Sequence, residues 1–207
     1  MRYSTLEEKW NVRTHAFGFA ASIAGLVFLL VQASSPLEKL ASFIFGLSLC
    51  LLFLASTLYH SAINENRRQK LRIFDHAAIY VLIAGTYTPV CLIPLRDSIG
   101  LMMLVVIWSI AAAGILLKLF FTGKYDNIST IMYVAMGWVA VFGLNAILQT
   151  IETPQLLWLL AGGIAYTLGA IIYAIQRIPF NHAIFHVFVL IGSACHYFMI
   201  VGLNSYS

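Results

Sequence analysis

The last hydrophobic segment of the chain, between Asn181 and Ile200, carries three of the six histidines. On a helix of 3.6 residues per turn, His182, His186 and His196 project from one face, with His186 and His196 each about 40° from His182. His182 and His186 are spaced i, i+4, which places two imidazoles one turn apart, as a metal ion bound to a single helix requires. Because ionisable groups are costly in a segment apolar enough to lie in lipid, this face predicts a functional site.

Two other apolar segments carry polar residues that could complete such a site. Ser56 and His60 lie near the end of one segment, and Asp75 lies near the start of the next. If the segments cross a membrane in turn, these residues lie at the same depth as His182 and His186. Three histidine ligands leave a tetrahedral Zn²⁺ one open position, which is typical of catalytic sites.

The sequence therefore predicts a zinc site with defined roles. We expect His60, His182 and His186 to bind Zn²⁺. Asp75 is expected to hold or deprotonate the water in the open position, which suggests metal-assisted hydrolysis. Ser56, one turn before His60, is placed to orient a ligand or stabilise an oxyanion.

The composition identifies the elements that must position these residues. Of the 207 residues, 61% are hydrophobic and 10% are charged, whereas soluble domains have roughly 25% charged residues. Charged residues lie mostly between apolar runs of about 20 residues, the length that crosses a bilayer as a helix. We expect an all-α integral membrane protein: one seven-helix bundle over residues 1–207, with spans at about 15–33, 40–62, 73–93, 99–121, 129–149, 156–175 and 182–203.

Lysine and arginine are distributed unequally between the two sides of this bundle. One side receives only Lys39 and Arg96. The other side receives the remaining ten: Arg2, Lys9, Arg13, Arg67, Arg68, Lys70, Arg72, Lys118, Lys124 and Arg177. The positive-inside rule places the N-terminus in the cytoplasm and the C-terminus outside. Membrane topology therefore explains the net charge of +4, and no nucleic-acid partner is expected.

Each candidate residue also has a purely structural interpretation. Histidines in membrane helices often hydrogen-bond a neighbouring helix without binding a metal. Asp75 could form an ion pair with His76 or Arg72, and Ser56 could bond a backbone carbonyl. On the sequence alone these alternatives stay open.

The other histidines are expected outside the ligand shell. His196 lies ten residues beyond His186, about 15 Å deeper by helix rise, so it cannot share a metal with the cluster. We expect it to be packed and hydrogen-bonded, with a role in a substrate cavity as the alternative. His15 and His76 are expected near the membrane interface, where water can solvate them.

Three motifs, in order, carry a resemblance to a known family. Residues 55–61 (ASTLYHS), 74–80 (FDHAAIY) with 84–89 (AGTYTP), and 182–186 (HAIFH) with His196 resemble bacterial hemolysin III proteins. These belong with the progestin and adipoQ receptor family, which includes the adiponectin receptors. The resemblance covers essentially the whole chain and implies an intramembrane zinc near the cytoplasmic side of a bacterial plasma membrane.

The resemblance assigns roles to the same positions. His60, His182 and His186 match the family's zinc ligands, and Asp75 matches the aspartate that holds the zinc-bound water. The chain lacks the long N-terminal extension of the animal receptors, so their hormone-binding role is not carried over. Its motifs also resemble those of alkaline ceramidases, which by analogy implies hydrolysis of a lipid amide.

The leading hypothesis is a zinc-dependent hydrolase of a lipid amide or ester, with a membrane lipid as substrate or ligand. The alternative is a non-enzymatic membrane-homeostasis, receptor-like or cytolytic protein with a structural zinc. The two differ at the fourth zinc position. A protein ligand there would exclude the enzyme, whereas a water beside a lipid-sized cavity would favour it.

Overall fold

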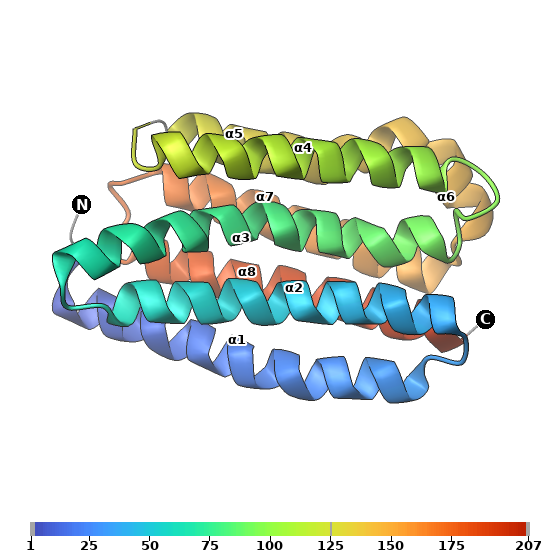
Figure 1. The fold of residues 1–207 in the computed structure, drawn as a ribbon, viewed down its shortest axis with the longest axis horizontal. Helices are drawn as coiled ribbons and strands as arrows, with labels where there is room; N and C mark the ends of the chain where they lie inside the picture. The colour runs from blue at the N-terminus through green and yellow to red at the C-terminus, as the bar shows by residue number, and fades with distance from the viewer. Residues whose placement is uncertain (1–2, 125, 206–207) are drawn as a thin grey trace.

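The structure is a computed structural model that describes residues 3–124 and 126–205, and Arg2 of the charge pattern lies outside them. Within the described residues all regular elements are helices (Figure 1), which confirms the all-α expectation. The elements are α1 (Thr5–Gln32), α2 (Pro36–Ser61), α3 (Glu65–Leu92), α4 (Gly100–Phe121), α5 (Asp126–Gly137), the 3₁₀ helix η1 (Trp138–Gly143), α6 (Leu144–Thr150), α7 (Thr153–Ala174) and α8 (Asn181–Ser205).

The number of apolar spans corrects the sequence expectation of seven. In the described part of the chain, six segments are long and apolar enough to cross a membrane: Thr5–Gln32, Pro36–Ser61, Gly100–Phe121, Ile128–Thr150, Thr153–Ala174 and Asn181–Asn204. The expected span 73–93 is not among them, although it lies within the helix α3. Its polar residues, which include Asp75, His76, Thr86 and Thr88, lower its apolar content.

Two helices begin well before the apolar segments that predicted them. Helix α1 starts at Thr5 rather than at residue 15, because the Ser4 hydroxyl caps it by accepting from the backbone N–H of Glu7 at 3.2 Å. Helix α3 starts at Glu65 rather than at residue 73, capped by Asn64. Both helices therefore extend beyond the apolar segments as polar turns, and these turns lie beside the candidate site.

The expected span 129–149 is broken rather than continuous. Helix α5 is followed by η1 and then by α6. The side chain of Tyr87, from α3, enters this break: its hydroxyl donates to the Gly137 carbonyl at 2.7 Å and accepts from the Ala140 N–H at 2.8 Å. A side chain that replaces backbone hydrogen bonds in this way accounts for the interruption.

The helices run roughly parallel to the long axis of the bundle, and the N-terminus and C-terminus lie at opposite ends (Figure 1). Helix α1 packs against α2 and α8, α2 against α3, α3 against α4 and α5, and α7 against α5 and α8. Helix α1 therefore packs against both α2 and α8, the two helices that carry the expected histidines.

Small residues let α2 approach its neighbours closely. A Cβ at Gly46 would lie 2.6 Å from Leu26 of α1, and the Ser22 hydroxyl of α1 donates to Cys50 Sγ at 3.2 Å. The same face of α2 ends in His60, which is only 4% exposed. The small residues of α2 and the buried His60 therefore lie on one side of the helix, which faces the bundle.

Candidate metal site

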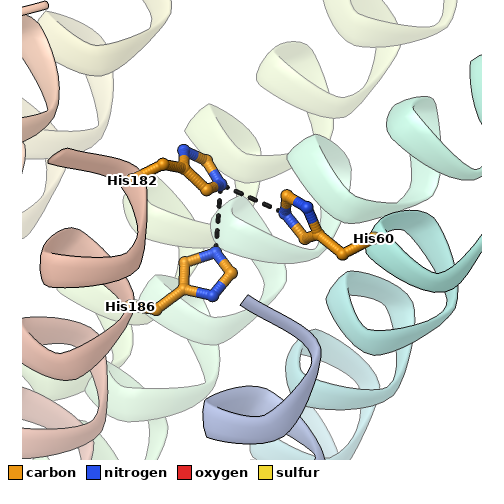
Figure 2. Close-up of side chains that lie close together, drawn as sticks. All are labelled: His60, His182 and His186. Atoms are coloured by element: carbon orange, nitrogen blue, oxygen red, sulfur yellow. Dashed lines mark hydrogen bonds between the residues drawn. The ribbon is translucent and has the colours of Figure 1, made fainter. Parts of the chain in front are cut away.

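Three histidines from two helices meet at the end of the bundle where the chain begins. His60 comes from the last turn of α2, and His182 and His186 come from the first turns of α8 (Figure 2). The Nε2 atom of His182 lies 3.1 Å from that of His60 and 3.0 Å from that of His186. All three side chains are buried, and their metal-ligating atoms lie within 4.8 Å of one another. This group could hold a metal ion.

The outward nitrogens of the rings determine where the protons lie. His60 Nδ1 is 2.6 Å from a carboxylate oxygen of Glu8, and His186 Nδ1 is 3.3 Å from the backbone carbonyl of Asn11. Because both oxygens can only accept, each contact requires a proton on Nδ1, and the Nε2 lone pair of a ring protonated there alone faces inward. His182 Nε2 faces both lone pairs, and a single N–H cannot point at two acceptors. A cation at the centre satisfies all three nitrogens, so the donor set fits a metal.

The third ring is held on its outer side by Tyr3. The Tyr3 hydroxyl lies 3.0 Å from His182 Nδ1, and the two rings stack with centroids 4.5 Å apart. Burial raises the pKa of the Tyr3 hydroxyl well above its ordinary value, so it stays a neutral phenol. Tyr3 therefore supplies a polar contact to His182 without adding a charge.

His15 is closer to the site than the sequence indicated. We expected it at the interface with access to water, but it is only 3% exposed. Its ring stacks on that of His186, with centroids 3.5 Å apart and planes 8° apart. It does not belong to the three-histidine group. The misjudgement follows from the early start of α1, which carries His15 into the bundle.

A cavity of about 370 Å³ lies beside the three-histidine group. Asp75, Ser56, His182 and His186 all contribute to its wall, so α2, α3 and α8 bring the expected polar residues to one space. Most of the remaining wall is apolar and includes Leu52, Ile79, Leu82, Ile83, Val134, Leu156, Leu159 and Val189. Cavities of this size and lining suit an apolar ligand with a few polar groups.

His196 lies along the same cavity, away from the metal-binding group. Its Nε2 donates to the Leu159 carbonyl of α7 at 3.2 Å, and its ring packs against Gly162. The side chain is 7% exposed and also forms part of the cavity wall. The expected packed, hydrogen-bonded histidine is thus observed, and its position does not conflict with the cavity interpretation.

The sequence reasoning missed the residues of α1 that contact the site. The buried polar or small residues of this helix are Glu7, Asn11, His15, Gly18 and Ser22. Their spacing of three or four residues marks one buried face of α1, and this spacing is the signal that could have revealed Glu7 and Asn11 beside the site. Because the predicted span began at residue 15, the first two positions were not considered.

The fold and the histidine group together define a class, an integral membrane protein of apolar helices with a buried candidate metal site. Within this class, the chain belongs to the haemolysin-III-related family, whose model matches residues 3–197. This match confirms the resemblance seen in the sequence motifs.

Individual relatives align over nearly the whole chain. The chain is 42% identical over 202 residues to the Hemolysin-3 homolog of Bacillus subtilis (strain 168), covering 96% of this chain and 95% of the relative. It is 41% identical over 198 residues to Hemolysin-3 of Bacillus cereus, with 94% and 90% covered. It is also 31% identical over 205 residues to the human Monocyte to macrophage differentiation factor, with 94% and 83% covered.

Proposed function

We propose that this chain is a zinc-dependent membrane hydrolase that cleaves a lipid amide or ester. The observation that carries the proposal is the convergence of three imidazole nitrogens, from His60, His182 and His186, at the edge of a largely apolar cavity. A metal at that place would meet the polar part of a lipid whose chain lies in the cavity. The substrate would enter from the membrane between the helices.

The donor set favours zinc among the common metals. Imidazole nitrogens suit zinc, and three protein ligands with an open position are typical of catalytic zinc sites. Nitrogens about 2.0–2.1 Å from a tetrahedral Zn²⁺ lie roughly 3.3 Å from one another. Two of the three separations, 3.1 Å and 3.0 Å, are close to this value, and all three ligand atoms lie within 4.8 Å of one another.

Asp75 and Ser56 would carry out the proton transfer and the charge stabilisation. A bound zinc polarises a carbonyl and lowers the pKa of water. The Asp75 carboxylate would accept a proton as a water oxygen attacks the carbonyl carbon, and would return it to the departing nitrogen or oxygen as that bond breaks. The Ser56 hydroxyl would donate a hydrogen bond to the developing oxyanion. Both residues border the cavity together with His182 and His186.

We further propose that α3 crosses the membrane with the six apolar helices, so that the chain makes seven crossings in a bacterial plasma membrane. The polar groups in the second half of α3 are satisfied inside the bundle. Thr86 and Thr88 donate to the backbone carbonyls of Leu82 and Ala84, both at 2.8 Å. A helix with such internal hydrogen bonds can lie in hydrocarbon. Seven crossings place the two termini on opposite sides of the membrane, and the Lys and Arg bias favours a cytoplasmic N-terminus.

The test of the reaction uses purified protein in mild detergent and a panel of ceramides, N-acyl amides and lipid esters. Released fatty acid is measured by mass spectrometry. We expect at least one lipid class to be cleaved, with cleavage lost on chelation and restored by Zn²⁺. If zinc-loaded protein cleaves none of them, the hydrolase proposal is wrong.

A second function is favoured by the name of the Bacillus cereus relative, Hemolysin-3. In that alternative the metal is structural and the protein lyses membranes without chemical turnover. Haemoglobin release from erythrocytes, measured on the same preparation, separates the two. Lysis without fatty acid release would support the second function, and fatty acid release without lysis would support the hydrolase.

A further inference from the structure

The outer nitrogens of the three histidines all contact one short stretch of the chain, residues 3–11. Glu8 contacts His60, Tyr3 contacts His182, and the Asn11 carbonyl contacts His186. The same stretch also fixes the backbone of α8, because Glu7 accepts a hydrogen bond from the backbone N–H of His182 at 3.3 Å. The start of α1 and Tyr3, just before it, therefore contact all three rings, which come from two other helices.

Glu8 is itself held in place by Arg68 of α3. One carboxylate oxygen accepts from His60 Nδ1, and the other pairs with the guanidinium of Arg68, from α3. The Arg68 guanidinium also lies over the ring of Tyr59, 4.9 Å from its centroid. The Glu8 side chain is 17% exposed and that of Arg68 is 14% exposed, so the pair is largely shielded from water. A carboxylate fixed by two charge-assisted contacts has little freedom to turn away from His60.

We infer that the start of α1, with Tyr3, is the positioning element of the metal site, and that Glu8 is the positioning residue for His60. This inference rests on the proposed zinc site. Glu8 orients the ring of His60, keeps its proton on Nδ1 and increases the electron donation of Nε2 toward a metal. Outer partners of this kind contribute about 10–100-fold to metal affinity in known sites. Arg68 acts one step further out by orienting Glu8.

The test measures metal binding in Glu8→Gln and in a second test variant, Tyr3→Phe, with Lys9→Gln as the matched control. Lys9→Gln removes a charge from the adjacent, exposed position of α1. Tyr3→Phe keeps the stacked ring but removes the hydroxyl that faces His182. Zn²⁺ affinity is measured by competition with a chromophoric chelator. The visible spectrum of the Co²⁺-loaded protein reports the coordination geometry, and circular dichroism reports the fold.

We expect Glu8→Gln to weaken zinc binding by about 10–100-fold and to change the Co²⁺ spectrum, with an unchanged helical signal. Tyr3→Phe should weaken binding several-fold, and Lys9→Gln should match the wild type.

The outcomes separate this inference from the proposed function. If the wild type binds zinc and both Glu8→Gln and Tyr3→Phe bind it equally tightly with the same Co²⁺ spectrum, the inference is wrong and the zinc site stands. If the wild type binds neither Zn²⁺ nor Co²⁺, the zinc site and the inference both fail. If Glu8→Gln does not fold, Tyr3→Phe against Lys9→Gln decides.

Discussion

The Nε2 atom of His182 lies 3.1 Å from the Nε2 atom of His60, although 122 residues separate them in the sequence. Each ring is turned toward the other by a contact on its opposite side, to Tyr3 for His182 and to Glu8 for His60. Two inward-facing imidazole nitrogens at this distance, with a third from His186, are the basis of the zinc site that we propose.

Asp75→Asn separates metal binding from chemistry. Asp75 borders the cavity but does not belong to the three-histidine group. We therefore expect the variant to keep its zinc and to lose at least 100-fold in lipid hydrolysis, because an amide cannot accept the proton of the attacking water. Metal analysis and fatty acid release are measured on one preparation. Full activity in the variant would exclude Asp75 as the base.

Gly162→Ala tests the packing of α7 against α8. A Cβ at Gly162 would overlap the ring of His196, and both are held in helices. We expect a loss of about 1–3 kcal/mol in the free energy of unfolding, measured by denaturant titration in detergent. Gly163→Ala is the control, because the nearest atom to its Cβ would be Trp138 at 3.9 Å. Equal stability of the two variants would contradict this packing.

The location of the C-terminus tests whether α3 crosses the membrane. With seven crossings and a cytoplasmic N-terminus, a reporter fused after Ser207 lies outside, whereas with six crossings it lies in the cytoplasm. We expect alkaline phosphatase to be active at this position and a fluorescent protein that folds only in the cytoplasm to be dark. A fusion at the N-terminus is the control and should show the opposite pattern. A C-terminal fusion that reports cytoplasm would overturn the seven crossings.

Much of the fold could be predicted from hydropathy, because helices in lipid must satisfy their own backbone hydrogen bonds. Hydropathy could not predict the polar first turns of a helix. Residues 5–14 of α1 and 65–72 of α3 are helical because of caps at Ser4 and Asn64. The break after α5 also depends on a distant residue, Tyr87, whose hydroxyl contact has no local signal.

The candidate site, like the fold, could be predicted from the sequence only in part. The His182 and His186 pair is local, since i, i+4 spacing on one helix places both rings on one face. His60 and Asp75 could be placed by matching depth, because alternating spans return to the same side of a membrane. The contacts of Glu8 and Tyr3 depend on α1 packing against both α2 and α8, and no spacing along the chain encodes that arrangement.

Metal analysis tests the central claim most directly. Purified wild type, His60→Ala, His182→Ala, His186→Ala and His196→Ala are compared by zinc content per chain. We predict about one zinc in the wild type and in His196→Ala, since His196 lies about 15 Å from the group by helix rise. We predict a loss of zinc in each of the other three variants. A wild type without zinc, or zinc content that is unchanged in those three, would contradict the account.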